Sequence, residues 1–116
     1  MAPSPVSIVD VQAAVRKFRD ARDWKQFHSP KNLSMSIAIE AAELMEHFQW
    51  LTTDQASRLA HTDPQAREAI LEELADVLIY CFSLADFLEC DAAKIIFDKL
   101  EKAGHKYPVE AYRGRF

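Results

Sequence analysis

The sequence predicts an all-α protein, and three observations support this fold class. The 116 residues include only two glycines and five prolines, so residues that interrupt helices are scarce. Apolar residues recur at helical spacing rather than in the alternation of strands. Typical capping residues also precede the periodic segments. At this length, with 49% hydrophobic residues, the chain has room for one domain and one modest core.

The first part of the chain is expected to form one helix followed by a loop. Ser7 and Asp10 have the spacing of a capping box, and the helix should end before Trp24. Its apolar positions follow a helical period and are interpreted as a core face: Val11, Ala14, Val15 and Phe18. The segment 23–32, DWKQFHSPKN, is predicted to be a loop because Pro30 interrupts it and no period persists.

The rest of the chain is expected to form three further long helices and one short one. A second helix should run from Asn32 or Leu33 to Trp50, with its apolar stripe at Leu33, Ile37, Leu44 and Phe48. A short helix through Ala60 should start at a cap formed by Thr52 and Gln55.

Two acids mark the starts of the last two helices. Asp63 followed by Pro64 should begin a third long helix that reaches about Glu89. Asp91 should cap a fourth, which Gly104 closes. We therefore expect a single domain over residues 1–116, with a core at about 8–107 and an irregular tail at 108–116.

The charge and cysteine patterns argue against several classes of protein. The net charge of −4 does not favour nucleic acid as a partner. The longest strongly apolar stretch, VLIYCFSLA, is too short to span a membrane, and the start, MAPSPVSIVDV, does not resemble a signal peptide. Cys81 and Cys90 lie on one predicted helix at a separation beyond disulfide reach. A reduced, cytoplasmic protein is expected.

Two pairs of acids indicate a metal site. Glu40 and Glu43 are three residues apart on the second helix, and Glu73 and Asp76 have the same spacing on the third. Residues three apart differ by about 60° around a helix axis, so each pair projects from one face. If the two helices pack antiparallel, four carboxylates can converge. Hard oxygen ligands of this kind suit Mg²⁺ or Mn²⁺.

The common alternative is that these acids are solvated surface residues. Surface acids on helices usually have a basic neighbour three or four residues away, yet residues 32–57 and 68–93 contain no lysine or arginine. Glu73 and Asp76 also lie within the apolar sequence ILEELADVLIYCF, where an unpaired charge would be costly. A metal site is therefore favoured. A di-iron bundle would need Glu-x-x-His, which is absent from this sequence, and the histidines and cysteines do not have zinc-ligand spacing.

The sequence around these acids resembles that of the MazG-like nucleoside triphosphate pyrophosphohydrolases. E-x-x-E followed by E-x-x-D on consecutive helices is typical of this family, and four longer sequences match its pattern in order: RDWKQFHSPKNL (22–33), IEAAELMEHFQW (39–50), EELADVLIYC (72–81) and KLEKAGHKYPVE (99–110). They are similar to the branch that includes the dCTP pyrophosphatases. The resemblance covers about residues 8–112.

The resemblance implies a role for each of these residues. The metal ligands would be Glu40, Glu43, Glu73 and Asp76, with Glu40 or Glu43 as the catalytic base. Trp24 and Trp50 would contact the base, with Tyr80 nearby. Either tryptophan could equally be a core or interface aromatic residue, and core packing is favoured for Tyr80. Lys31, Lys102 and Lys106 would contact the phosphates. Ala103 stands where many relatives carry asparagine, and Val15 stands where some carry histidine. The base preference of the family therefore does not carry over.

The expected activity is hydrolysis of a nucleoside triphosphate to the monophosphate and pyrophosphate, dependent on Mg²⁺ or Mn²⁺. The enzyme would remove unwanted nucleotides or act on dCTP. The alternatives are a non-catalytic helical interaction module and a nucleotide sensor without turnover. Four helices on so short a chain should leave apolar surface exposed, so an oligomer is expected, and the resemblance implies a homodimer or homotetramer.

Overall fold

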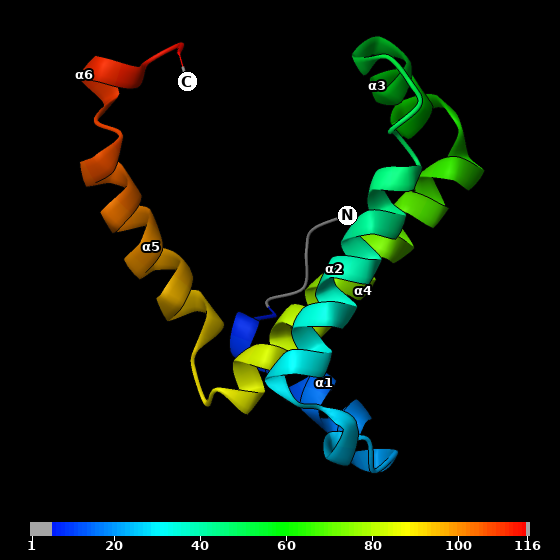
Figure 1. The fold of residues 1–116 in the computed structure, drawn as a ribbon, viewed down its shortest axis with the longest axis vertical. Helices are drawn as coiled ribbons and strands as arrows, with labels where there is room; N and C mark the ends of the chain where they lie inside the picture. Colours follow the sequence, from blue (N-terminus) through cyan, green and yellow to red (C-terminus); the bar gives the residue numbers. More distant parts are fainter. Residues whose placement is uncertain (1–5, 116) are drawn as a thin grey trace.

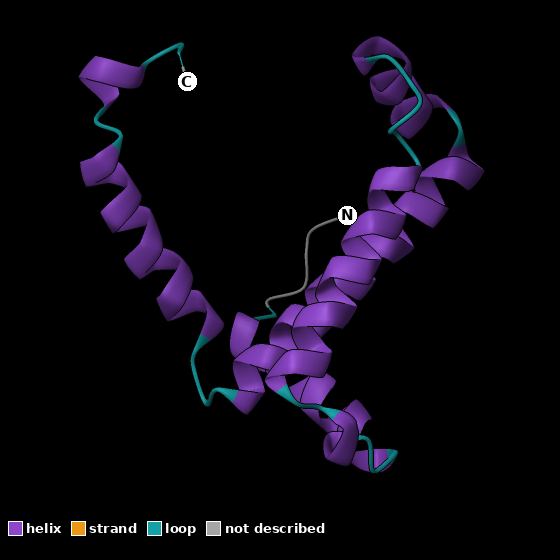
Figure 2. Cartoon of the chain, viewed as in Figure 1, coloured by secondary structure: helices purple, strands orange, loops and turns teal. Residues whose placement is uncertain are grey.

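The computed structural model describes residues 6–115, and every regular element in that range is a helix (Figure 1, Figure 2). The predicted all-α class is therefore confirmed. Residues 1–5 and 116 of the predicted domain lie outside the described range. The elements in chain order are α1 (Ile8–Ala21), the 3₁₀ turn η1 (Lys25–Phe27), α2 (Pro30–Glu46), α3 (Thr53–Thr62), α4 (Pro64–Phe87), α5 (Ala92–Lys106) and α6 (Val109–Tyr112).

Side-chain caps begin the helices largely where the sequence predicted them. Ser7 and Asp10 form a reciprocal capping box on α1, with both hydrogen bonds at 3.1 Å. Thr52 and Gln55 form a second capping box on α3, which continues to Thr62 rather than ending at Ala60. Asp63 accepts hydrogen bonds from two amides at the start of α4. These caps satisfy amide groups that have no partner inside a helix.

The predicted bounds of the second helix were wrong at both ends. α2 begins at Pro30, because the Ser29 side chain accepts a hydrogen bond from the Asn32 amide and proline is tolerated in a first helical turn. Pro30 therefore starts a helix, although its sequence context predicted that it would interrupt one. The helix ends at Glu46, and residues 47–50 form turns, which places Trp50 beyond the helix.

The C-terminal part of the chain is more helical than predicted. α5 continues through Gly104 to Lys106, since glycine is tolerated within a helix at a modest cost. Pro108 then precedes the short helix α6, which lies in the tail predicted to be irregular.

The helices pack around α4. The contact between α2 and α4 is the most extensive one, and α1 and α3 contact α4 at other positions (Figure 1). Leu33 is only 2% exposed, and the other members of its predicted stripe, Ile37, Leu44 and Phe48, are partly buried. The predicted inner face of α2 is therefore the one that faces its neighbour. In the described range only Leu33, Ala85 and Ala92 are fully buried apolar residues, so the core is small.

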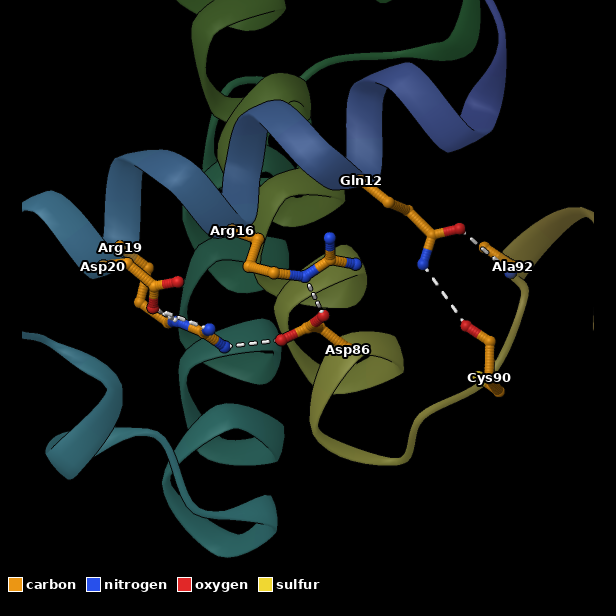
Figure 3. A network of polar contacts seen from close by, with 7 residues as sticks. All are labelled: Gln12, Arg16, Arg19, Asp20, Asp86, Cys90 and Ala92. Carbon is orange, nitrogen blue, oxygen red and sulfur yellow. Dashed lines mark hydrogen bonds and ion pairs between the residues drawn. The ribbon is translucent and has the colours of Figure 1, made fainter.

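α5 begins at the bundle and then diverges from it. The Gln12 side-chain amide donates to the Cys90 carbonyl at 3.3 Å and accepts from the Ala92 amide at 3.2 Å, which ties the start of α5 to α1 (Figure 3). Beyond this point α5 is a separate arm (Figure 1). The radius of gyration is 17.3 Å, whereas a compact chain of this size would have about 13 Å.

An ion-pair network with a buried Arg19 at its centre joins α1 to the C-terminal half of α4. The Arg19 guanidinium donates to Asp86 at 2.6 Å and also pairs with Asp20, while Arg16 pairs with the second oxygen of Asp86 (Figure 3). Burial alone would raise the pKa of Asp86, but the two guanidinium groups outweigh it and hold that pKa below its usual range. The network fixes α1 against α4 through the Arg19–Asp86 pair, which is largely removed from water, whereas Arg16 and Asp20 are about half exposed.

Two further observations concern the cysteines and the character of the helices. Cys81 and Cys90 are both free, as the sequence predicted. In the part of the chain that the structure describes, no helix combines the length and the apolar character needed to cross a membrane.

We predict that Asp86→Asn lowers the free energy of unfolding by about 3 kcal/mol, because it leaves the buried Arg19 charge without its main partner. Urea denaturation followed by circular dichroism measures this. The control is Lys94→Ala, which removes the exposed Lys94–Asp98 pair and should change little. Equal effects of the two variants would show that the Arg19–Asp86 pair is not a tertiary anchor.

Candidate active site

Acids from α2 and α4 meet between the two helices. Glu40 on α2 and Glu73 and Asp76 on α4 each offer a carboxylate oxygen, and these oxygens lie within 4.8 Å of one another. Glu73 and Asp76 lie on the face of α4 that continues with Tyr80 and Ser83, at intervals of three and four residues. Acids from the two helices therefore converge, as their spacing predicted for helices that pack against each other.

Glu43 lies at the edge of this group. It is exposed and is not one of the three residues whose oxygens gather within 4.8 Å. Its carboxylate is nevertheless close enough to Glu40 to contribute to the raised pKa of that residue. Glu43 is therefore the member of the predicted set that lies outside the close group of acids.

The cluster holds more negative charge than its surroundings can neutralise. The neighbouring carboxylate of Glu73, burial, and the carboxylate of Glu43 raise the pKa of Glu40 from 4.5 to about 7. One oxygen of Glu40 and one of Glu73 are buried and have no hydrogen-bond partner among the described residues. Two ionised carboxylates cannot hydrogen-bond to each other, so this site requires either a shared proton or a cation.

An apolar cavity of about 550 Å³ opens beside the acids. Glu40 and Asp76 lie at its wall together with Trp24 and Tyr80. The rest of the lining comes from α1, the loop after it and the second half of α4: Ala14, Val15, Phe18, Arg19, His28, Ile79 and Ser83. This volume is in the range of small-molecule sites, and aromatic and aliphatic walls beside a few polar groups are typical of them.

A smaller cavity of about 230 Å³ shares three residues with the first, namely Trp24, His28 and Tyr80. Trp24 packs edge-on against Phe18, with ring centroids 5.9 Å apart, and is 45% exposed. It is therefore partly accessible where the two cavities meet. Tyr80 reaches the same junction from α4.

The structure does not bring the other predicted substrate contacts to this cavity. Trp50 lies beyond the end of α2, is 86% exposed and lines neither cavity. Lys31 is in the first turn of α2, about 13 Å along the helix axis from Glu40. Lys102 and Lys106 are on the α5 arm, away from the α2–α4 pair (Figure 1). The acids, Trp24 and Tyr80 therefore share one region of this chain, whereas Trp50 and the three lysines do not lie there.

Sequence reasoning missed several residues that line the cavity. Phe18 and Val15 were interpreted as core, but they face the cavity because α1 crosses α4 without closing over it. Arg19 and its partner Asp86 were not identified. The isolated acid in the apolar sequence LADFL was the available signal, because a buried carboxylate needs a partner.

His28 is a further cavity residue that was not predicted to belong to the site. Burial, followed by the Arg19 charge, lowers its pKa and so favours the neutral imidazole. Its Nδ1 atom is buried without a hydrogen-bond partner within the described range.

The architecture, a helical protein with clustered acids beside an apolar cavity, agrees with comparisons to known proteins. The model of the MazG-like family matches residues 35–115. The chain is 36% identical over 113 residues to dCTP pyrophosphatase 1 of Rattus norvegicus and 35% identical over 112 residues to that of Homo sapiens. Each alignment covers 97% of this chain and 65% of the relative.

A solved structure shows the same fold. The crystal structure of a pyrophosphatase from Archaeoglobus fulgidus superimposes with a TM-score of 0.79 at 37% identity, covering 93% of this chain and 98% of that one. The chain belongs to the MazG-like family. It spans about two thirds of the length of the mammalian relatives that it matches.

We predict that the melting temperature of the protein, measured in a chelator, falls as the pH rises from about 5 to about 8. The folded-state pKa of Glu40, about 7, lies above the ordinary value of 4.5, so the folded protein holds a proton that the unfolded chain releases. The stability associated with that proton is complete below pH 4.5 and is lost as the pH rises through 7.

Glu40→Gln should remove this slope and melt at a higher temperature than the parent at pH 8, since it deletes one of the mutually repelling charges. Differential scanning fluorimetry across this pH range tests both statements. Identical slopes in parent and variant would rule out Glu40 as the titrating group.

Proposed function

We propose that this protein hydrolyses a nucleoside triphosphate to the monophosphate and pyrophosphate. The observation that carries the proposal is the cluster of Glu40, Glu73 and Asp76 beside an apolar, aromatic-walled cavity. A nucleotide has the matching two parts, a polyanion that needs cations and a flat base that binds between apolar and aromatic groups. The named relatives and the neighbouring structure, a dCTP pyrophosphatase and a pyrophosphatase, support the same reaction class.

The four acids fit a hard divalent cation. The buried, partnerless oxygens of Glu40 and Glu73 are donors of the kind that Mg²⁺ prefers, and Mn²⁺ is a suitable substitute. We propose that Glu40, Glu43, Glu73 and Asp76 hold Mg²⁺. When bound, it would neutralise phosphate charge and lower the pKa of a coordinated water.

Within this arrangement we assign proton transfer to Glu43 or Glu40. A carboxylate accepts the proton of the attacking water most readily if it is not fully engaged with cations. Glu43 meets this condition better, because it lies outside the close group of three oxygens and is exposed. Glu40, which lies within the close group, would instead help to hold the cation between the acids of α2 and α4. Attack at the α-phosphorus then releases pyrophosphate.

The cavity would hold the base and sugar. Trp24 and Tyr80 provide aromatic faces, while Val15, Phe18 and Ile79 enclose the remaining volume. Such walls select for a flat aromatic group and contribute few hydrogen bonds to distinguish one base from another. A preference for dCTP or for removal of unwanted nucleotides is therefore a narrower proposal, based on the dCTP pyrophosphatases that the chain resembles.

We also propose that the protein functions as a homo-oligomer in the cytoplasm. Its small core and many exposed apolar side chains support self-association, and its two free cysteines suit a reducing compartment. A non-catalytic interaction module would not need a cluster of acids that is incomplete without a proton or cation. The cluster favours the catalytic proposal over that alternative.

Product analysis tests the reaction. In H₂¹⁸O with Mg²⁺, the protein should convert triphosphates to pyrophosphate and ¹⁸O-labelled monophosphate, as resolved by ³¹P NMR and mass spectrometry. Glu43→Gln and Asp76→Asn should each lower kcat by about a hundredfold or more. Glu46→Gln, which changes an exposed acid one turn from Glu43, is the matched control and should retain activity. Orthophosphate and diphosphate as first products would contradict the proposal.

The base pocket makes a separate prediction. Trp24→Ala should raise KM by about fivefold to a hundredfold and change kcat less, because stacking on a base contributes about 1–3 kcal/mol to binding. Steady-state kinetics with four deoxynucleoside triphosphates measures this. Trp50→Ala removes an indole that lies outside the cavity of its own chain, and comparing the two variants shows which tryptophan contacts the base. An unchanged KM for Trp24→Ala would exclude this cavity as the base site.

A further inference from the structure

The loop after α1 places Trp24 in the wall of the larger cavity, and the way in which α1 ends determines that placement. The Trp24 amide donates to the Arg19 carbonyl at 3.1 Å. The Asp23 amide donates to the Asp20 carbonyl, also at 3.1 Å. These two bonds define a Schellman motif, in which the residue after the helix cap adopts a left-handed backbone conformation. Trp24 is therefore the second residue beyond the cap, which is Arg22.

The motif also provides the side-chain contact that orients the indole. The second residue beyond the cap commonly packs against a residue in the last turns of the helix. Here Trp24 packs edge-on against Phe18. The Arg22 guanidinium lies over the Phe18 ring, 3.6 Å from its centroid, and donates to the Phe18 carbonyl at 3.0 Å. Phe18 and Trp24 both line the larger cavity, so the end of α1 forms part of its aromatic wall.

Asp23 occupies the left-handed position, where glycine is the usual residue. Its φ is 55°, a conformation that residues with a β-carbon rarely adopt, although aspartate tolerates it better than most. Its carboxylate accepts a hydrogen bond from the Gln26 side-chain amide at 3.1 Å, and its carbonyl accepts one from the same nitrogen at 3.0 Å. Glycine could accept only the second of these bonds. Residues in such conformations cluster at functional sites, where the surrounding structure holds them in place.

A second Schellman motif ends α4 and provides an internal comparison. Glu89 has a φ of 53° there, and its amide donates to the Asp86 carbonyl at 3.0 Å. The Cys90 amide donates to the Ala85 carbonyl at the same distance. In the described part of the chain, Asp23 and Glu89 are the only non-glycine residues with a positive φ. Glu89 lines neither cavity, so the two positions share a backbone conformation and differ in their relation to the candidate active site.

We propose that Asp23 and Gln26 are positioning residues for the base pocket: their hydrogen bond holds the loop after α1 in the conformation that keeps the Trp24 indole in the cavity wall. The inference deepens the proposed function and rests on it for the substrate, a nucleotide whose base lies against Trp24. Asp23 and Gln26 are exposed and line neither cavity, so they act on binding only through the indole. A wall that is already in place lowers the entropic cost of binding.

Asp23→Gly separates this role from an ordinary contribution to stability. The variant relieves the left-handed conformation but loses the carboxylate that binds Gln26. Its melting temperature should therefore equal or exceed that of the parent, because glycine is the favoured residue at this position. Its KM for deoxynucleoside triphosphates should nevertheless rise by about threefold or more, with kcat changed less. Asp23→Asn keeps an acceptor oxygen and tolerates the same backbone conformation, so it should retain the parental KM.

Three further comparisons test the route of the effect. Gln26→Ala removes the donor and should raise KM as Asp23→Gly does. Glu89→Gly makes the same backbone change at the end of α4 and is the matched control, with a parental KM expected. In a Trp24→Ala background, Asp23→Gly should change KM no further, because its effect passes through the indole. A parental KM in both Asp23→Gly and Gln26→Ala, equal changes in Asp23→Gly and Glu89→Gly, or an additive effect with Trp24→Ala would each overturn the proposal.

A measurement without turnover separates this inference from the proposed reaction. The chain has two tryptophans, so Trp50→Phe leaves Trp24 as the only indole. In this background, time-resolved fluorescence anisotropy should find the indole fixed, more mobile after Asp23→Gly or Gln26→Ala, and unchanged after Asp23→Asn. Equal mobility in all four proteins would overturn the positioning role, whether or not the protein is active. If the parent cleaves no triphosphate while the mobility follows this order, the proposed reaction is refuted and the placement of Trp24 by Asp23 and Gln26 stands.

Discussion

Like charges at the contact between α2 and α4 are the constraint on which the rest of this structure depends. Two helices that pack closely would normally place apolar residues along their whole contact, and the stripe through Leu33 does so. One turn of each helix instead carries carboxylates, with buried oxygens that have no partner in the described chain. Their repulsion must be balanced by packing elsewhere, by a proton on Glu40 or by a cation. The apolar contacts between α2 and α4, which include the buried Leu33, hold the two helices together across this charged turn.

This constraint explains why the site has two chemically different halves. The acids lie where α2 and α4 are in contact, and the apolar cavity lies beside them, where α1 crosses α4. Arg19 is placed at that crossing, but its charge is already neutralised, so it shapes the wall without making the cavity positive. The positive charge of the chain is concentrated at residues 16–31 and on the arm beyond Asp91. The fold thus separates charges that the proposed chemistry would bring together.

The sequence predicted those features that depend on local pattern. Helix starts at Ser7, Thr52 and Asp63 followed from side chains that cap amides within three residues, and the inner stripe of α2 followed from its period. The paired spacing of the acids also anticipated that Glu40, Glu73 and Asp76 would meet. The MazG-like resemblance was correct for the same reason, since the family's motifs are local.

Features that depend on tertiary context were not predicted. Pro30 was misread because proline interrupts a helix interior but suits a first turn, and only the Ser29 cap distinguishes the two. The direction of α5 and the cavity at the α1–α4 crossing depend on how separate elements pack, which no local period encodes. The Arg19–Asp86 pair joins residues 67 positions apart, so its two members carry no sequence pattern that links them.

The side chain of Gln12 holds α5 at its start, so a small rotation there produces a large displacement of the C-terminal lysines. Its two hydrogen bonds to Cys90 and Ala92 hold the arm at one end only, and the helix that follows is about 22 Å long. A rotation of about 10° at Asp91 would move Lys106 by about 4 Å, more than the length of a hydrogen bond. A single buried amide therefore controls the position of side chains at the far end of the arm. The angular tolerance of that one joint limits how accurately these charges can be positioned.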